Sequence, residues 1–371
     1  MISKEAQIVL LCSSTQHTEK ELDLIQKLVS VDVDWGEFLY LCTHHRVIPL
    51  VWRTLSELSL LDIVENHVRR VMKNVVDSIA YQNNKVYQEM KSIVEELHYQ
   101  KIPYVALKGL YLSSFIYGDV SLRQFGDVDF LVDEADLDRV TGVLIKYGYE
   151  QGKINVNNNT IKSVSRQEKL HRRINTHEIV EFVKLTDDPL CPYYMIDVNF
   201  SLTWKASGSD YSVATNDFLK TAIQVKNELI EINVLPYEYQ IIQLCMHLYS
   251  EAVYFCWHTN WMRDKSDLNL IKFCDIHELV KQYPVDWNKI LLITEKHKIH
   301  KPVYYSLYLT NELFPNFIPK DIIDSIGCKA EIINQYYDKH GNVHYWNMNF
   351  MDRMFEINKK VQEIQQCSGI L

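Results

Sequence analysis

Two aspartates, Asp127 and Asp129, are the residues whose types and spacing point most directly to chemistry. They lie in the run Gly-Asp-Val-Asp-Phe-Leu-Val at residues 126–132, which predicts a β-strand. Because side chains along a strand alternate between two faces, both carboxylates would lie on one face, about 6–7 Å apart. Two neighbouring acids repel each other unless a cation lies between them, and oxygen ligands of this kind suit Mg²⁺. The alternative is an ordinary polar face at the end of a strand.

A third aspartate, Asp197, lies within a second apolar run at residues 193–200. Strand alternation places Asp197 and Asn199 on the face opposite to the core-facing side chains. A lone buried carboxylate is costly, so Asp197 requires a partner or a metal ion. If the two strands are neighbours, the three carboxylates could hold two metal ions that clamp the oxygens of a phosphoryl displacement. The alternative is an ion pair with one of three arginines: Arg166, Arg172 or Arg173.

A turn between a predicted strand at residues 103–107 and a predicted helix carries Lys108 and Gly109. Glycine lets the backbone approach a phosphate, and the N–H groups at the start of the helix are donors for it. Lys108 could pair with phosphate oxygens as a point charge, and Arg123 could also bind a triphosphate. The alternatives are a solvated turn lysine and, for Arg123, neutralisation of Asp119.

The composition excludes several classes of protein. The chain has 371 residues, 47% hydrophobic and 23% charged, as in packed globular proteins rather than disordered ones. With a net charge of −9, the protein lacks the broad positive field that binding of a long nucleic acid needs. No apolar run approaches the ~18 residues of a membrane span, and residues 8–12 are too short for a secretory signal. We therefore expect a cytoplasmic protein with no membrane partner, and we interpret its eight scattered cysteines as reduced core thiols.

The texture of the sequence changes along the chain. Up to about residue 100 the apolar residues are spaced as in helices, and Asp34 is a predicted N-cap. Residues 64–97 predict one long helix. Asn83 is its one in-phase residue that is not apolar, which predicts a break or a less buried turn there. The next segment alternates a helix capped by Asp133 with predicted strands at residues 103–107, 126–132, 177–185 and 193–202. From about residue 236 the spacing is helical to the end. We expect an α+β fold, with a small mixed-sheet core at residues 101–205 between helical regions at residues 1–100 and 206–371.

The residues around the acids resemble a known family. The run Leu107-Lys108-Gly109, the segment Tyr117-Gly118-Asp119, Arg123 and residues 126–132 are similar to the uncharacterised nucleotidyltransferase family of the DNA polymerase beta-like nucleotidyltransferase superfamily. The resemblance covers roughly residues 30–315. It implies a minimal nucleotidyltransferase fold at the core, a divalent metal and transfer from a nucleoside triphosphate. It also implies that Asp127 and Asp129 are metal ligands and that Asp197 is the third carboxylate, as a base or a ligand.

Two positions depart from the pattern of the superfamily. A Gly-Ser pair is usual at the first turn, whereas this chain has Lys108-Gly109, as is usual in this branch. The branch often has a histidine in an Asp-x-His-Trp pattern after the third acid, whereas this chain has Asn199-Phe200. The three acids are intact, so we expect an active enzyme.

These residues predict a Mg²⁺-dependent nucleotidyltransferase, with Mn²⁺ as the alternative ion. It would move a nucleoside monophosphate from a triphosphate such as ATP to a hydroxyl or phosphate acceptor on a small molecule, peptide or protein, as in natural-product modification. Lys108, Gly109 and Arg123 would bind the nucleotide. The alternatives are a glycosyl or phosphoryl transferase that modifies a peptide from a nucleotide-sugar, and a non-catalytic nucleotide-binding or interaction protein. Residues 257–264 interrupt the helical spacing and predict a loop over the site.

Motifs of other enzyme classes are absent from the sequence. It contains no H-E-x-x-H, no G-x-S-x-G, no P-loop and no G-x-G-x-x-G. Zinc hydrolases, serine hydrolases, P-loop kinases and dinucleotide-dependent oxidoreductases therefore lose support.

Overall fold

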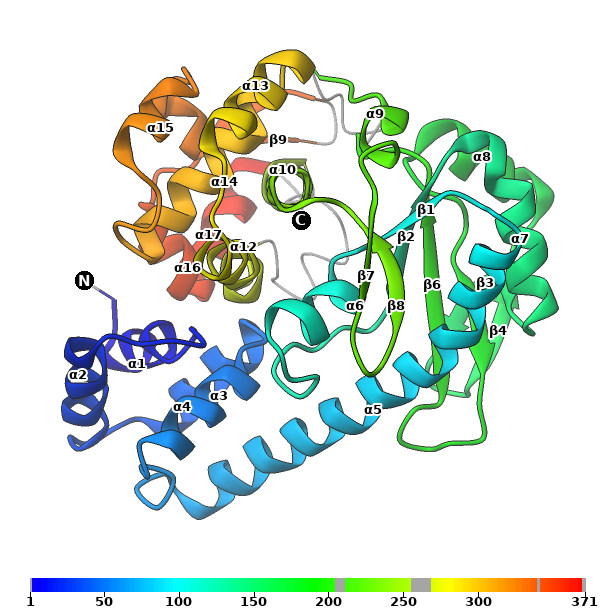
Figure 1. Cartoon of the computed structure of the whole chain (residues 1–371). Coiled ribbons are helices and arrows are strands. Elements are labelled where there is room, and N and C mark those ends of the chain that lie inside the picture. The colour runs from blue at the N-terminus through cyan, green and yellow to red at the C-terminus, as the bar shows by residue number, and fades with distance from the viewer. Residues whose placement is uncertain (1, 204–210, 255–267, 339–340, 369–371) are drawn as a thin grey trace. The chain divides into compact units, whose positions relative to one another are not determined.

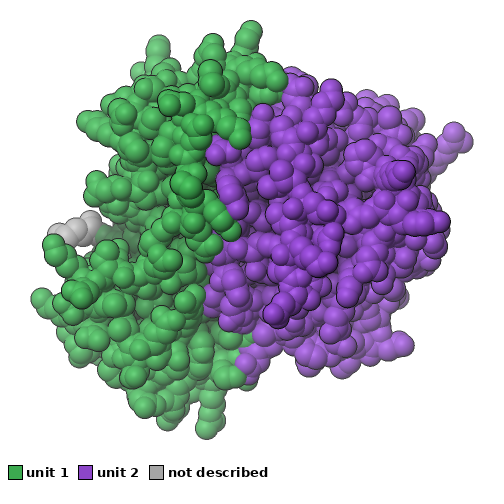
Figure 2. Space-filling view, in the orientation of Figure 1, with its two compact units in different colours: residues 1–76, 241–371 green, residues 77–240 purple. Residues whose placement is uncertain are grey.

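The computed structural model describes residues 2–203, 211–254, 268–338 and 341–368 (Figure 1). The chain divides into two compact units, which Figure 2 distinguishes by colour. Unit 1 combines residues 1–76 with residues 241–371, and unit 2 is the continuous segment 77–240. The expected regions 1–100, 101–205 and 206–371 followed local texture, and as domains they stay a prediction.

Unit 2 is built on a six-stranded mixed sheet in the order β1-β2-β6-β5-β3-β4 (Figure 1). Its strands are β1 (Tyr104–Leu107), β2 (Val128–Val132), β3 (Glu150–Asn155), β4 (Thr160–Ser163), β5 (Phe182–Leu185) and β6 (Tyr193–Asn199). Strand β2 runs parallel to β6, and the other neighbouring pairs are antiparallel. The expected α+β fold with a small mixed sheet is confirmed.

The connection between the parallel strands β2 and β6 is long, because parallel neighbours cannot be joined by a tight turn. It contains helices α7 (Leu137–Lys146) and α8 (Arg166–Asn175) and strands β3, β4 and β5. The carboxylate of Asp133 accepts a hydrogen bond from the backbone N–H of Ala135 at 2.8 Å. Asp133 thus caps a short 3₁₀ helix, Glu134–Asp136, that leads into α7, whereas the N-cap of α7 itself is Asp136, without a side-chain hydrogen bond. The predicted strands lie where β1, β2, β5 and β6 are found, whereas β3 and β4 were missed because their sequences are mostly polar.

Helix α5 (Asn66–Tyr99) corrects one expectation. The prediction of a break or a less buried turn at Asn83 was wrong, since the helix is continuous and Asn83 is buried. The side-chain amide of Asn83 donates to the backbone carbonyls of Val120 at 2.6 Å and Arg123 at 3.0 Å. A polar residue is tolerated on this buried helix face because its N–H groups are satisfied. Asn83 thereby fixes the loop that leads into β2.

Unit 2 also contains two short helices, a π-helical turn and a β-hairpin. Helix α6 (Gly109–Tyr111) follows β1 directly and continues into a π-helical turn, Leu112–Ile116. Helix α9 (Thr215–Leu219) precedes a hairpin of β7 (Ile223–Lys226) and β8 (Glu231–Val234), and β8 packs beside β1. Helix α10 (Tyr237–Tyr254) begins at the end of this unit.

Unit 1 is mainly helical, as its sequence predicts. Its first segment contains α1 (Lys4–Leu11), α2 (Glu19–Val29), α3 (Trp35–His44) and α4 (Ile48–Glu57). Its second segment contains α12 (Leu270–Gln282), α13 (Trp287–His297), α14 (His300–Leu313), α15 (Lys320–Ser325), α16 (Phe350–Phe355) and α17 (Ile357–Ser368). The carboxylate of Asp34 accepts hydrogen bonds from the N–H groups of Gly36 and Glu37, as expected of an N-cap. A short hairpin, β9 (Gln335–Tyr337) with β10 (Val343–Tyr345), interrupts the expected run of helices.

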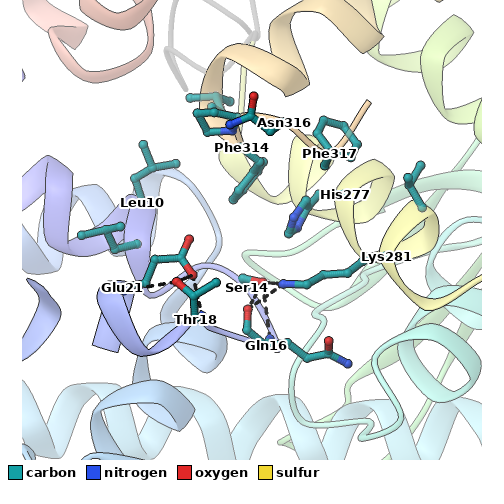
Figure 3. Close-up of a pocket in the computed structure, with 14 residues that line it drawn as sticks. Leu10, Ser14, Gln16, Thr18, Glu21, His277, Lys281, Phe314, Asn316 and Phe317 are labelled. Atoms are coloured by element: carbon teal, nitrogen blue, oxygen red, sulfur yellow. Dashed lines mark hydrogen bonds between the residues drawn. The ribbon is translucent and has the colours of Figure 1, made fainter. Parts of the chain in front are cut away.

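A buried carboxylate joins the two sequence segments of unit 1. Glu278 on α12 is fully buried and accepts hydrogen bonds from Ser14 Oγ and Thr15 N, both at 3.0 Å. Beside it lies a pocket of about 400 Å³, where the ring of His277 stacks on Phe314 with centroids 4.2 Å apart (Figure 3). This pocket contains none of the residues that the sequence predicts for catalysis.

The remaining structural expectations concern membranes and thiols. None of the helices in the described ranges is long and apolar enough to cross a membrane. Cys12, Cys42, Cys191, Cys245 and Cys274 are buried free thiols, as expected, and Cys328 is a partly exposed one. The predicted loop at residues 257–264 lies outside the described residues.

Candidate functional site

The sheet brings two of the three predicted acids directly together. Strands β2 and β6 are hydrogen-bonded neighbours, and Asp129 is paired with Asp197 in their parallel register. Residues paired in this way point to the same face of a sheet, so the two carboxylates lie side by side. The opposite face of β6 carries Ile196 and Val198, both fully buried, as the alternation of the sequence predicts. The two strands are therefore neighbours, which the sequence left as a condition.

Asp127 lies one residue before β2 rather than within it. It is two residues from Asp129, and its charge acts on the carboxyl of Asp197. Asp127, Asp129 and Asp197 thus form one electrostatic cluster, which we call the carboxylate cluster.

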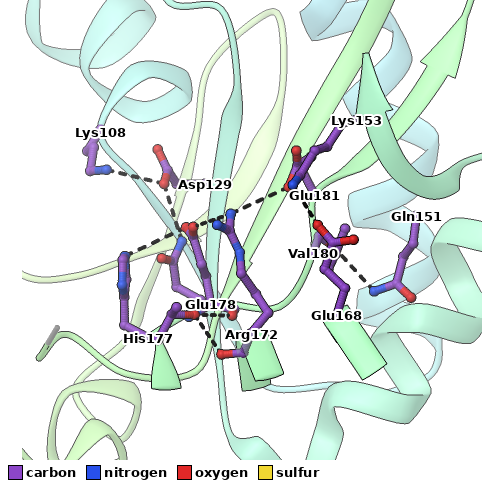
Figure 4. A network of polar contacts seen from close by, with 12 residues as sticks. Lys108, Asp129, Gln151, Lys153, Glu168, Arg172, His177, Glu178, Val180 and Glu181 are labelled. Carbon is purple, nitrogen blue, oxygen red and sulfur yellow. Dashed lines mark hydrogen bonds and ion pairs between the residues drawn. The ribbon is translucent and has the colours of Figure 1, made fainter. Parts of the chain in front are cut away.

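The carboxylate of Asp129 accepts hydrogen bonds from two side chains outside the carboxylate cluster, one of which is Lys108 (Figure 4). Its Oδ1 atom accepts a hydrogen bond from Lys108 Nζ and another from Asn199 Nδ2, both at 3.2 Å. The side chain of Asp129 is 8% exposed and that of Lys108 21% exposed. Lys108 therefore contacts a carboxylate in this structure, at the edge of solvent.

Several negative charges surround Asp197. Burial, together with the charges of Glu178, Asp127 and Asp129, raises the pKa of Asp197 to about 9, while Lys108 opposes the rise. The alternative partner for Asp197, an arginine, is contradicted for two of the three candidates: Arg172 pairs with Glu178 and Glu181, and Arg173 pairs with Glu134. Across the described ranges, no lysine or arginine forms an ion pair with Asp197.

The turn that carries Lys108 has an unusual backbone. Lys108 has φ 47° and ψ −119°, a conformation that favours glycine over other residues. Gly109 follows it, and a Cβ atom there would lie 2.5 Å from Phe125 Cβ and 2.7 Å from Phe125 Cγ. Close packing of Gly109 on Phe125 thus holds the turn in place, and with it the base of the Lys108 side chain.

The strain at Lys108 can be measured with two variants that both remove the ammonium group. We expect Lys108→Gly to be more stable than Lys108→Ala by about 1–2 kcal/mol, because only glycine adopts this backbone conformation without cost. Urea unfolding of the two proteins measures the difference. Equal stability, or a more stable alanine variant, would show that the turn is unstrained.

Two residues that the sequence did not single out, His177 and Glu178, complete the site together with Arg172. An isolated antiparallel bridge joins Glu178 to Asn199, and the carbonyl of His177 accepts hydrogen bonds from the N–H groups of Phe200 and Ser201. Arg172 Nη2 contacts Glu178 Oε1 at 2.8 Å, and His177 Nε2 lies 3.6 Å from Glu178 Oε2 (Figure 4). The only sequence signal was a predicted extended segment beginning at residue 177.

The charges of Arg172, His177 and Glu178 interact with the carboxylate cluster. Burial raises the pKa of Glu178, Arg172 opposes the rise, and Asp129 adds to it. Burial also lowers the pKa of His177 to about 3, and the positive charges of Lys108 and Arg172 lower it further. His177 is therefore a neutral imidazole at neutral pH.

The neutral state of His177 has a consequence for stability. The unfolded chain protonates this histidine near pH 6.5 and the folded chain only near pH 3, so acid favours the unfolded state. We expect this residue to remove about 2 kcal/mol of unfolding free energy between pH 6.5 and pH 4.5. Urea unfolding at both pH values should give a smaller loss for His177→Gln than for the unchanged protein. An equal loss in both proteins would contradict the assignment.

Arg123, predicted to bind nucleotide, lies in the loop before β2. Its backbone carbonyl is held by Asn83, and its Nη1 donates to the carbonyl of Gln124 at 3.0 Å. These contacts fix the loop, and a role of Arg123 in nucleotide binding stays a prediction.

The chemistry of the donor set fits a hard divalent cation, because several carboxylates crowd one another in a largely buried place. Within the ranges that the structure describes, no group of three or more His, Cys, Asp or Glu side chains is arranged so that it could hold a metal ion. In this arrangement one oxygen of Asp129 is held by Lys108 and Asn199. Metal ligation by Asp127, Asp129 and Asp197 stays a proposal.

The fold and the site together define a class: an α+β protein in which neighbouring strands of a small mixed sheet present aspartates beside a lysine-glycine turn. The sequence model of the uncharacterised nucleotidyltransferase family matches residues 31–315, and the chain belongs to this family. The family is one of nucleotidyltransferases, which supports nucleotidyl transfer as the general kind of reaction and implies a nucleotide substrate. No curated protein matches the chain.

Proposed function

We propose that this protein transfers a nucleoside monophosphate from a nucleoside triphosphate, ATP being the first to test, to a hydroxyl or phosphate acceptor in a reaction that requires Mg²⁺ or Mn²⁺. The observation that carries the proposal is the register of β2 and β6, in which Asp129 and Asp197 are direct neighbours, with Asp127 two residues away. The family supports the general reaction. The negative charges of Glu178, Asp127 and Asp129 that act on Asp197 support the need for a cation.

In this proposal each residue has a defined part. Asp127, Asp129 and Asp197 would hold the cation, which would offset phosphate charge and lower the pKa of the acceptor hydroxyl. The N–H groups after Lys108 would receive phosphate oxygens, since a turn with a glycine lets the nucleotide approach closely. Lys108 would add a positive charge to the phosphates, and we propose the same for Arg123.

The bonds made and broken follow from this arrangement. The acceptor oxygen attacks the α-phosphorus in line, the bond between the α-phosphorus and its bridging oxygen breaks, and pyrophosphate leaves. The proton of the acceptor passes to Asp197 or to water. Positioning and charge stabilisation by fixed groups supply most of the acceleration in such reactions.

The acceptor is proposed from charge. A net charge of −9 disfavours a long nucleic acid, so a small molecule, a peptide or a protein is the proposed partner. The free thiols of the described cysteines fit a reducing compartment, and we propose the cytoplasm.

Release of the leaving group tests the proposal. The purified chain is incubated with Mg²⁺ or Mn²⁺, a pool of candidate acceptors and, separately, each α-labelled nucleoside triphosphate or labelled nucleotide-sugar. We expect pyrophosphate release and transfer of the α-label from one triphosphate. Release of a nucleoside diphosphate from a nucleotide-sugar would support the glycosyl transferase instead. Neither product with any donor, despite Mg²⁺-dependent nucleotide binding, would favour the non-catalytic alternative.

A further inference from the structure

The ammonium group of Lys108 lies among the acids of the site rather than in solvent. Its Nζ is 3.2 Å from Asp129 Oδ1 (Figure 4). Its charge also acts on Asp197 and Glu178. Each of these groups is negative when ionised, so the charge of Lys108 stabilises them in the protein alone.

The position of Lys108 on Asp129 competes with any other cation for that carboxylate. Oδ1 of Asp129 already accepts two hydrogen bonds, from Lys108 and from Asn199. A divalent ion that takes Asp129 must overcome the repulsion of an ammonium group at ordinary ion-pair distance. Such repulsion weakens with distance, so it falls when the lysine moves away.

The backbone and side chain of Lys108 differ in their freedom to move. The strained turn is held by the packing of Gly109 on Phe125, so the Cα atom is fixed. The side chain has four methylene groups and is 21% exposed, so its ammonium can reach another anion without a change in the fold. The same turn is where we propose that nucleotide phosphates bind.

We propose that Lys108 is the resident counter-ion of the carboxylate cluster, and that a divalent cation takes Asp129 only as Lys108 moves from this carboxylate to the nucleotide phosphates. The inference rests on the proposed function, because it needs both a cation and a triphosphate in this site. It follows that the protein binds divalent metal weakly alone, and that metal and nucleotide strengthen each other's binding.

Titration of Mn²⁺ tests this exchange, with the free ion measured by electron paramagnetic resonance. We expect Lys108→Met to bind Mn²⁺ alone about tenfold more tightly than the unchanged protein, because a repelling charge is removed. Addition of the non-hydrolysable α,β-methylene analogue of ATP should tighten Mn²⁺ binding about tenfold in the unchanged protein and less than twofold in Lys108→Met. A purely structural role for Lys108 cannot produce tighter metal binding.

Three control variants make the result specific. Lys108→Arg keeps the charge and should bind Mn²⁺ alone as weakly as the unchanged protein. Lys184→Met removes a lysine that pairs with Glu89 elsewhere in unit 2, and it should have no effect. Asp129→Asn should lose Mn²⁺ binding with or without the analogue.

The outcomes separate the inference from the proposed function. If Asp129→Asn binds Mn²⁺ like the unchanged protein, the metal site and the proposed function both fail. If Asp129→Asn loses Mn²⁺ but Lys108→Met binds it no more tightly, the exchange by Lys108 is overturned and the metal site stands. The exchange by Lys108 is also overturned if the analogue strengthens Mn²⁺ binding in Lys108→Met as much as in the unchanged protein.

Discussion

Asp129→Asn is expected to lower the rate of pyrophosphate release by at least about 10²–10³-fold, the loss that follows removal of one group stabilising transition-state charge. Asp129 is the central acid: it is paired with Asp197 across β2 and β6 and contacts both Lys108 and Asn199. Asparagine has nearly the same shape but no charge, so the loss would reflect chemistry rather than packing. The rate is measured with the triphosphate identified by the product assay, at saturating Mg²⁺.

The matched control for this prediction is Asp138→Asn. Asp138 is an exposed residue of α7 in the same unit, outside the carboxylate cluster, and its replacement should leave the rate within about twofold of the unchanged protein. Both variants should have cooperative thermal unfolding. An Asp129→Asn protein that is folded and still reacts within tenfold of the unchanged rate would remove this acid from the proposed mechanism.

Gly109→Ala is expected to destabilise the protein by about 3 kcal/mol. The added Cβ would lie 2.5 Å from Phe125 Cβ and 2.7 Å from Phe125 Cγ, atoms at the base of a ring that cannot swing aside. Relief requires movement of the turn or of the loop that carries Phe125, and both lie next to the proposed catalytic acids. Urea unfolding measures the change.

Gly142→Ala is the control for this prediction, because here the same change from glycine to alanine should increase stability. Gly142 lies within α7, and its added Cβ would meet nothing within 4 Å. We expect this variant to be more stable by about 0.5–1 kcal/mol, because alanine loses less backbone entropy than glycine on forming a helix. If both variants changed stability alike, the contact with Phe125 would not be the cause.

Much of the architecture could be predicted because it depends on local spacing. Alternation along residues 126–132 and 193–202 predicts β2 and β6, and it predicts correctly that Ile196 and Val198 are buried on the side opposite to Asp197. Asp34 and Asp133 are recognisable helix caps because a cap is made by adjacent residues. The family was recognised from the acids and the lysine-glycine turn, and the match over residues 31–315 confirms it.

What could not be predicted depends on contacts between distant parts of the chain. The sequence wrongly predicts a break or a less buried turn at Asn83, because the hydrogen-bond acceptors of this side chain, on Val120 and Arg123, lie about 40 positions away. His177 and Glu178 escaped notice because they reach the site through pairing with residues 199–201. The sequence could not predict that β2 and β6 are neighbours, whereas the structure shows that they pair in the sheet. Metal ligation and nucleotide contacts stay predictions.

The buried amide of Asn83 also bears on how this protein could be redesigned. A procedure that rewards regular hydrophobic spacing would replace Asn83 with leucine, since every other in-phase position of that helix is apolar. The replacement would leave two carbonyl groups without their donor, in the loop that leads into β2 and the proposed catalytic acids. Improvement of the scaffold and preservation of its chemistry therefore make opposite demands on this one side chain.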